Sequence, residues 1–336
     1  MLYEPWGENI QFNNQTVEIH NVLHKKSKKQ QIQQILSDLQ GPSKSISSIY
    51  FYDANGSALF EKITTLPEYY LTRTEIPLIE EAALVLCPGL HDAEIIEFGS
   101  GDCTKISLLL EAIPTQSHHT ITYVPFDVSD DAIKQSSQIL LETFPHIAVK
   151  GIVADFMTQL TVINTSKPAM FCFLGSTIGN LSMKQAAHFL TQISTIMKTE
   201  DTLLIGFDMV KDKRLLEQAY NDRQQVTEIF NKNILHVINK RVGTDFNPSD
   251  FDHVAFFNES QSRIEMHLQA KKPITITCPD PYEQILIKEN ERIRTEYSYK
   301  FTNEHIKMLA ENAGLYIQEV FTDDKHWFSL VQFKKT

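Results

Sequence analysis

From residue 94 to residue 207 the chain alternates short apolar runs with stretches of helical periodicity, and this alternation restricts the fold more than any other feature. Short apolar runs are typical of buried strands, and helices between them favour parallel pairing, because a parallel connection has to return along the sheet. We therefore predict an α/β protein whose parallel sheet carries helices on both faces. The predicted strands cover residues 95–98, 121–127, 147–153, 170–174 and 202–207, and the predicted helices cover residues 106–113, 132–144 and 182–197.

The alternation stops after Asp208 and returns near the C-terminus. Between these points the sequence predicts a long helix over residues 214–233 and a strand over residues 262–270. Near the C-terminus, a helix ended by a glycine precedes two strands that lie close enough in sequence to pair antiparallel. That helix covers residues 303–312, the glycine is Gly314, and the strands cover residues 315–321 and 327–334.

The chain has 336 residues, more than a single hydrophobic core usually accommodates, so we expect two domains. The sheet pattern places residues 75–210 together with 301–336 in one domain. Residues 1–74 together with 211–300 fall outside that pattern, and we predict that they form a second, mixed α+β domain that binds the substrate.

Polar and glycine residues follow three of the predicted strands. Gly99 and Gly101 come directly after the first strand, Asp127 ends the second, and Asp155-Phe156 follow the third. Open α/β sheets bind ligands at the carboxyl ends of their strands, and glycines there allow a ligand to approach the backbone closely. An acid at the end of the second strand suits the ribose hydroxyls of an adenosine cofactor.

Two adenosine cofactors remain open at this point, NAD and S-adenosylmethionine (SAM). NAD-binding loops carry a third glycine, which Thr104 replaces here. Asp155-Phe156 match methyltransferases better, with a carboxylate on the adenine amino group and a ring on the base. Five parallel strands finished by a helix and a hairpin are also the class I SAM methyltransferase (Rossmann-like) layout.

Composition excludes several other classes of protein. A formal net charge of −11 is unsuited to general nucleic-acid binding, which depends on lysine and arginine. No apolar run is long enough to span a membrane, and the N-terminus has no secretory pattern. The four cysteines are scattered and no metal-ligand spacing occurs, so we expect a cytoplasmic protein with free thiols and no metal. The absence of an exposed apolar stripe predicts a monomer.

Six motifs stand out along the chain: residues 50–60 (YFYDANGSALF), 66–75 (LPEYYLTRTE), 175–180 (GSTIGN), 219–222 (AYND), 263–266 (RIEM) and 296–301 (EYSYKF). Together they resemble the histidine-specific Nα-methyltransferase family, whose members begin ergothioneine synthesis. The resemblance runs from about residue 47 to the C-terminus.

The resemblance implies a SAM-dependent enzyme and a role for each matching position. The positions that hold the substrate carboxylate are Asn180 and Tyr220. Those that surround the imidazole ring are Glu296, Ser298 and Met266. The tyrosines near the reacting amine are Tyr52 and Tyr69, which we take as the catalytic candidates. The positions implied to bind SAM are Tyr69, Gly99, Lys105, Asp127, Asp155 and Phe156.

These residue types fit the chemistry of histidine. Glu296 can accept a hydrogen bond from an imidazole N–H, and Ser298 can pair with the other ring nitrogen. Three alternatives stay open: another amino acid such as tryptophan or a thiol-bearing histidine derivative, a SAM-binding protein without catalysis, and an NAD oxidoreductase. Each of these residues, taken singly, is also typical of core packing or of a solvated strand face.

Overall fold

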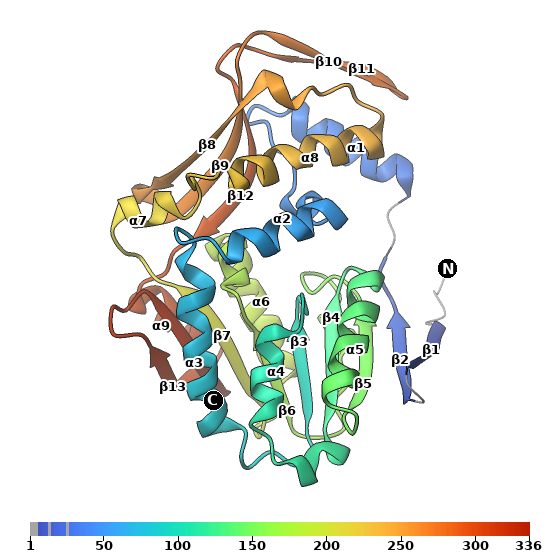
Figure 1. Ribbon diagram of the computed structural model, residues 1–336, viewed down its shortest axis with the longest axis vertical. Coiled ribbons are helices and arrows are strands. Elements are labelled where there is room, and N and C mark those ends of the chain that lie inside the picture. Colours follow the sequence, from blue (N-terminus) through green and yellow to red (C-terminus); the bar gives the residue numbers. More distant parts are fainter. Residues whose placement is uncertain (1–5, 13–14, 25–26) are drawn as a thin grey trace. The chain divides into compact units, whose positions relative to one another are not determined.

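The computed structural model describes residues 6–12, 15–24 and 27–336, and the chain divides into two compact units (Figure 1). Unit 1 comprises residues 1–24, 73–209 and 301–336, and unit 2 comprises residues 25–72 and 210–300. Within the described residues, every helix is too short or too polar to cross a lipid bilayer.

Unit 1 is built on one large sheet, and its described residues contribute nine strands. These are β1 (Trp6–Phe12), β2 (Gln15–Asn21), β3 (Glu94–Phe98), β4 (Thr122–Asp127), β5 (Ala148–Val153), β6 (Ala169–Phe173), β7 (Thr202–Asp208), β13 (Leu315–Thr322) and β14 (Phe328–Lys335). Their order across the sheet is β1-β2-β5-β4-β3-β6-β7-β14-β13. The strands from β2 to β7 in this order pair in parallel, and the others pair antiparallel. The predicted α/β class and the five central parallel strands are confirmed.

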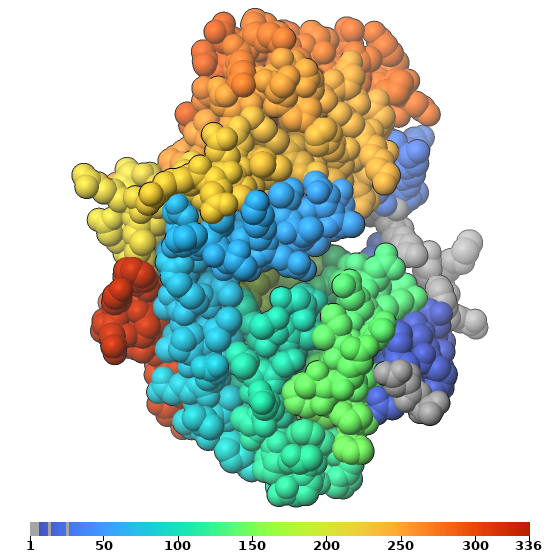
Figure 2. All heavy atoms as spheres, in the orientation of Figure 1, coloured from blue at the N-terminus to red at the C-terminus, as the bar shows by residue number. Residues whose placement is uncertain are grey.

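Helices cover both faces of this sheet. Successive strand residues point to opposite sides, so the buried strands present apolar side chains on both faces. On one face Ile95 and Cys172 belong to a core cluster shared with α3 (Tyr70–Leu86), α4 (Thr104–Glu111) and α5 (Asp130–Thr143). Figure 2 shows these three helices side by side on the surface of unit 1, coloured cyan to green. On the other face Phe98 packs against Phe189 of α6 (Met183–Ile196), with ring centroids 5.5 Å apart.

The structure corrects the expectation for the N-terminal residues, which we had placed in the second domain. The described residues 6–12 and 15–24 belong to unit 1. β2 adds in parallel to the edge of β5, and Val17 and Ile19 of β2 are buried in the core that contains Ile95. The alternating apolar residues of β2 thus extend the core on one face of this sheet.

The C-terminal residues complete the sheet as predicted. Helix α9 (Asn303–Asn312) is followed by Gly314, whose φ of +65° lies in the left-handed region that favours glycine. The antiparallel pair β13–β14 comes next, and β14 pairs with β7.

Unit 2 combines four helices with two small sheets in the part of the chain that the structure describes. The helices are α1 (Lys28–Gln40), α2 (Ala54–Thr64), α7 (Lys213–Gln218) and α8 (Val226–Val242). The strands are β8 (Phe251–Asn258), β9 (Arg263–Ala270), β10 (Ile274–Pro279), β11 (Tyr282–Ile287) and β12 (Arg292–Tyr299). β9 lies between β12 and β8 in an antiparallel sheet, and β10 pairs with β11.

The long helix predicted over residues 214–233 is wrong, because the chain breaks between α7 and α8. Asp222 lies in the break, and its carboxylate accepts hydrogen bonds from the N–H groups of Val226 and Thr227 at 2.9 and 2.8 Å. Burial raises the pKa of Asp222, but these two N–H groups outweigh it and hold the pKa below its ordinary value. Gln225, with a φ of +59°, then starts α8 in a new direction.

The segment over residues 50–60 has a structural function that its motif did not reveal. Asp53 caps α2 by accepting from the N–H of Gly56 at 2.8 Å, and it also accepts from the Asn233 amide of α8 at 2.8 Å. A Cβ atom at Gly56 would lie 1.7 Å from the Phe51 carbonyl oxygen, so only glycine fits there. Asp53 and Gly56 therefore fix α2 on α8.

Candidate active site

The glycine loop after β3 has the geometry of a ligand cradle. Gly99 and Gly101 have φ values of +73° and +49°, where other residues are strained. A Cβ atom added to Gly99 would meet nothing within 4 Å, so the space above this glycine is open. The loop leads through Cys103, also left-handed at a φ of +62°, into the N-terminus of α4.

Asp127 and Ser100 place polar atoms beside this loop. Burial raises the pKa of the Asp127 carboxyl, and hydrogen bonds from backbone N–H groups, that of Ser129 at 2.9 Å among them, oppose the rise. Ser100 is buried, and its Oγ has no hydrogen-bond partner among the described residues. An acceptor at Asp127, an orphan hydroxyl at Ser100 and the open face of Gly99 together fit the hydroxyls and polar groups of an adenosine cofactor.

Asp155 and Phe156 lie at the carboxyl end of β5, in the next strand of the sheet, and both are half-buried. The Asp155 carboxylate accepts from the N–H of Met157 at 2.8 Å and from the Thr158 hydroxyl at 3.0 Å, which fixes its direction. The Phe156 ring packs edge-on against Phe173, with centroids 5.4 Å apart. The carboxylate keeps further lone pairs, so its assignment to the adenine amino group stays a prediction.

Lys105 forms an ion pair with Glu75, a residue for which the sequence analysis predicts no role. Its Nζ lies 2.7 Å from Oε2 of Glu75, a carboxylate that is 1% exposed. Oε1 of Glu75 also accepts from the N–H of Gly175 at 2.6 Å. The ion pair thus links α3, α4 and the loop after β6, and a SAM-binding role for Lys105 stays a prediction.

Asn180 ends the loop that Glu75 anchors. This loop begins at Gly175, with a φ of +76°, and closes in a single 3-10 turn, Thr177–Asn180. The hydroxyl of Ser176 accepts from the N–H of Asp208 at 2.9 Å and so attaches the loop to β7. Asn180 itself is exposed.

In unit 2 the side chains of Tyr220 and Ser298 meet. The Tyr220 hydroxyl donates to Ser298 Oγ at 2.8 Å. Nζ of Lys300 donates to both oxygens, at 2.8 Å to Ser298 and at 3.1 Å to Tyr220. All three side chains are buried, and Lys300 is only 1% exposed.

Glu296 and Met266 lie on the same sheet face as this cluster. They are direct partners in the β12–β9 ladder, and Ser298 pairs in the same way with Ile264. Directly paired residues share a face, so Glu296, Met266 and Ser298 point to the side on which α8 packs. Glu296 is half-buried and Met266 is fully buried.

Tyr69 and Tyr52 differ in their surroundings. Tyr69 is buried, and its ring lies edge-on to Tyr220 with centroids 6.5 Å apart. Tyr52 is 49% exposed and packs its ring against Phe60 and Phe230 at 5.9 and 6.1 Å. Tyr69 therefore contacts Tyr220, whereas Tyr52 packs on Phe60 of α2 and Phe230 of α8.

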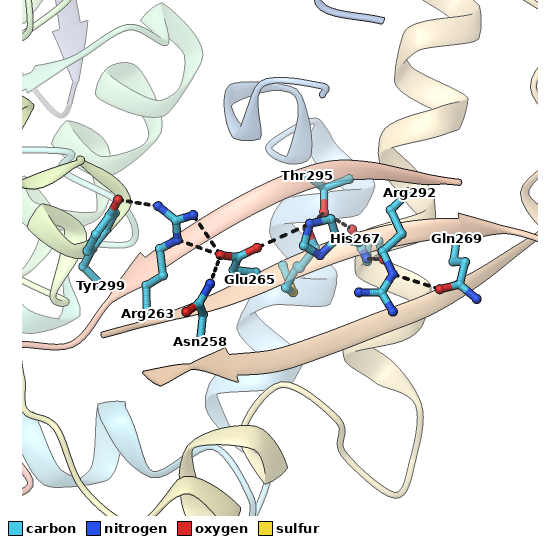
Figure 3. Close-up of polar contacts among 10 residues, drawn as sticks. Asn258, Arg263, Glu265, His267, Gln269, Arg292, Thr295 and Tyr299 are labelled. Atoms are coloured by element: carbon cyan, nitrogen blue, oxygen red, sulfur yellow. Dashed lines mark hydrogen bonds and ion pairs between the residues drawn. The ribbon is translucent and has the colours of Figure 1, made fainter. Parts of the chain in front are cut away.

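The opposite face of the same sheet carries a different polar network, which Figure 3 shows along β9. Arg263 donates to Glu265 at 2.9 Å and to the Tyr299 hydroxyl at 2.6 Å. His267 stacks on Phe256, and burial lowers its pKa to about 4, so it is uncharged at neutral pH. These groups are largely satisfied by one another, which is typical of a structural network.

Sequence reasoning missed three residues of this site: Glu75, Ser100 and Lys300. The alternation of β12 contained a usable signal for Lys300, because residues 296, 298 and 300 share one face. For Ser100 the one signal in the sequence is its place between Gly99 and Gly101. Nothing local distinguishes Glu75 from an exposed helical glutamate.

SAM and its demethylated product S-adenosylhomocysteine are expected to raise the melting temperature, and NAD is not. A ligand that binds only the native state must stabilise it by linkage. Asp127→Ala should abolish the shift, because it removes the acceptor beside the glycine loop. Thermal melts with each ligand at millimolar concentration test this, and a shift with NAD instead would contradict the cofactor assignment.

Comparisons with known proteins identify the family to which the chain belongs. The family model of histidine-specific, SAM-dependent methyltransferases matches residues 29–335. A histidine N-alpha-methyltransferase of Mycobacterium tuberculosis is 34% identical over 88% of this chain and 92% of its own length. Ergothioneine biosynthesis protein 1 of Schizosaccharomyces pombe is 30% identical over 79% of this chain and 36% of its own length. Among solved structures, a mitomycin 7-O-methyltransferase aligns over 92% of this chain and 67% of its own with a TM-score of 0.47 at 10% identity. The chain belongs to the family of SAM-dependent, histidine-specific methyltransferases.

Proposed function

We propose that this enzyme transfers methyl groups from SAM to the α-amino nitrogen of free L-histidine, up to Nα,Nα,Nα-trimethylhistidine (hercynine), as in ergothioneine biosynthesis. The observation that carries the choice of histidine is the shared face of β12. There Glu296 supplies an acceptor and Ser298 a hydroxyl, with Met266 opposite in the ladder. An imidazole ring has one nitrogen for each of these groups.

The remaining roles in this proposal come from the family resemblance. When bound, SAM supplies a methyl group on an activated sulfonium, so the protein's contribution is chiefly positioning. In this proposal Gly99, Asp127, Asp155 and Phe156 hold the cofactor. Asn180 and Tyr220 hold the substrate carboxylate. Tyr69 and Tyr52 lie near the amine, where a ring can stabilise the ammonium that forms.

The proposal requires the amine to lose its proton before transfer, since only the lone pair can attack carbon. An α-amino group at a peptide N-terminus has a pKa of about 8, and the carboxylate of a free amino acid raises that pKa further, so a minor fraction of the amine is neutral near pH 7.5. Methylation should therefore accelerate as pH rises toward 8 without a dedicated base.

One assay separates the proposal from its alternatives. The pure protein is incubated with SAM and each of the twenty amino acids, and mass spectrometry reads the methyl groups added. Histidine alone gaining up to three methyl groups is the expected result. Methyl groups added to tryptophan or another amino acid would identify that amino acid as the substrate of this methyltransferase. Methyl groups added to none of the twenty would support a SAM-binding protein without catalysis.

We also propose a monomer that acts in the cytoplasm and needs no metal. Activity is expected to survive EDTA, because the proposed transfer uses the sulfonium as its only electrophile. Light scattering during size exclusion should give the mass of one chain, 38.5 kDa. Activity lost to EDTA and restored by a divalent ion would contradict the metal-free proposal.

A further inference from the structure

Strand β12 contains a β-bulge at Thr295, where its register against β9 shifts. Arg294 pairs with His267, and the next pair is Glu296 with Met266, so β12 advances by two residues while β9 advances by one. Thr295 is therefore the extra residue of the bulge. A bulge changes the face on which the following side chains lie, because the alternation along the strand resumes one residue late.

The bulge determines on which face of the sheet Glu296 lies. Arg294 is on the face that carries the polar network of Figure 3, paired there with His267. Strict alternation from Arg294 would place Glu296 and Ser298 on that face as well. With one residue added, both lie on the opposite face, the side on which α8 packs, together with their β9 partners.

Asn231 of α8 bonds to all three strands of this sheet at the level of the bulge. Its Oδ1 accepts from the Thr295 hydroxyl of β12 at 2.7 Å, and its Nδ2 donates to the His267 carbonyl of β9 at 3.0 Å. Nδ2 also donates to Nδ1 of His253 of β8 at 2.8 Å. Asn231 and Thr295 are 0% and 1% exposed, so these bonds form away from bulk water.

The neighbours of Asn231 fix the orientation of its amide group. Nε2 of His253 lies 2.8 Å from the Tyr220 carbonyl oxygen, which can only accept, so Nε2 carries the hydrogen. Burial lowers the pKa of His253, so its ring is uncharged at neutral pH and Nδ1 is bare. The bare Nδ1 accepts from the NH₂ group of Asn231, which leaves the amide oxygen for Thr295.

We propose that Asn231 is a positioning residue, which holds the bulge at Thr295 and thereby keeps Glu296 and Ser298 on the face where the substrate ring binds. This inference rests on the proposed function, in which these two side chains face the imidazole. A binding side chain has to be held within about 0.5 Å of its productive position by the residues around it. A bulge interrupts the strand ladder, so at this point support comes from α8.

Thr295→Val tests the proposal, because valine keeps the shape of threonine and removes the hydroxyl that Asn231 accepts. The kcat/KM for histidine should fall by roughly tenfold, the order of one weakened hydrogen bond to the substrate. Thr295→Ser keeps the hydroxyl and should restore the wild-type value. Steady-state methyl transfer to histidine measures all three proteins.

Thr244→Val is the matched control for this substitution. Thr244 is 7% exposed, and its hydroxyl donates at 2.9 Å to Oδ1 of Asn239, another asparagine of α8. Asn239 lies about two turns beyond Asn231, so the control removes the same kind of bond to the same helix away from the bulge. It should lower the melting temperature about as much as Thr295→Val while leaving kcat/KM unchanged.

A double-mutant cycle shows whether the effect of Thr295 passes through Glu296. In a Glu296→Ala background, Thr295→Val should reduce kcat/KM much less than in the wild-type background, because the carboxylate that it would misplace is already absent. A loss of the same size in both backgrounds would overturn the proposal. So would an equal loss of kcat/KM in Thr244→Val and Thr295→Val.

Hydrogen exchange tests the bulge without any substrate. Amides of residues 292–299 should exchange faster in Thr295→Val and in Asn231→Ala than in Thr244→Val, because β12 opens more often where α8 no longer holds it. Asn231→Ala leaves the sequence of β12 unaltered and keeps the proposal testable if Thr295→Val does not fold. Equal exchange in the three variants would overturn the role of Asn231. Failure of the proposed function would look different, because the wild type would then transfer no methyl group to histidine, while exchange of β12 would still report on Asn231.

Discussion

Glu296→Ala is expected to lower kcat/KM for histidine by about ten- to a hundredfold while leaving turnover of phenylalanine, whose ring has no N–H, unchanged or raised. Loss of one hydrogen bond from a buried or charged group typically costs about 1–3 kcal/mol, and each 1.4 kcal/mol is tenfold in rate. Phenylalanine has no ring N–H to donate to the carboxylate, so its binding does not depend on Glu296, and the truncation removes a charged group that disfavours an apolar ring. Steady-state kinetics with both amino acids measure the ratio.

Two variants serve as controls for Glu296→Ala. Glu296→Gln keeps the size and one acceptor oxygen, so it should lose less histidine activity than Glu296→Ala. Asn180→Ala should weaken all amino acids about equally, because they share the carboxylate that Asn180 is proposed to hold. A histidine-to-phenylalanine ratio that Glu296→Ala leaves unchanged would show that this carboxylate does not select the ring.

The fold of unit 1 was predictable because each of its central strands carries its own local signal. A parallel strand buried on both faces is mostly apolar, and β7 is buried at every position and has Leu203, Leu204, Ile205 and Phe207 within it. The cofactor-binding candidates were predictable because the carboxyl ends of parallel strands meet at one edge of a sheet. Gly99, Asp127 and Asp155 thus follow neighbouring strands of the observed sheet.

The N-terminal strands could not be placed in this way. Val17 and Ile19 alternate with polar residues, which predicts a half-buried strand but does not say which sheet it joins. Its partner β5 lies more than a hundred residues away, and only the free edge of the folded sheet selects it. Long-range pairing of this kind leaves no trace in local periodicity.

The break between α7 and α8 was missed for a different physical reason. Residues 219–225 contain neither glycine nor proline, so no helix breaker marks the end of α7. The break depends on Asp222 capping a new helix and on Gln225 adopting a left-handed conformation, which is unusual for its type. The same break carries Tyr220, whose carbonyl and hydroxyl both bond to β-strand residues.

The burial of Glu75 and Lys300 could not be predicted from the sequence. Both are charged residues that a single sequence assigns to the surface, and both are almost completely buried. A buried charge is kept only where partners hold it, and those partners come from distant segments: Lys105 and Gly175 for Glu75, Tyr220 for Lys300. Their roles therefore emerge only from the folded chain.

Lys105→Met is expected to destabilise the protein by about 2–4 kcal/mol, because it leaves the Glu75 carboxylate buried without its cation. Breaking a buried ion pair by removing one partner costs about 3–5 kcal/mol of stability. The Lys105 side chain is 25% exposed, so the expected loss for this pair lies slightly below that range. In a domain of ordinary size the loss corresponds to a fall in melting temperature of roughly 5–15 °C. Thermal and urea unfolding without ligand measure it.

Lys167→Met is the matched control, since Lys167 is 28% exposed but pairs with Asp92, whose side chain is 67% exposed. An ion pair of that kind contributes about 0–1 kcal/mol, so the control should unfold close to the wild type. Equal stability of Lys105→Met and Lys167→Met would show that Glu75 does not depend on its partner. If Lys105→Met also lost the thermal shift with SAM while remaining as stable as the control, the lysine would serve the cofactor directly and not the Glu75–Gly175 anchor.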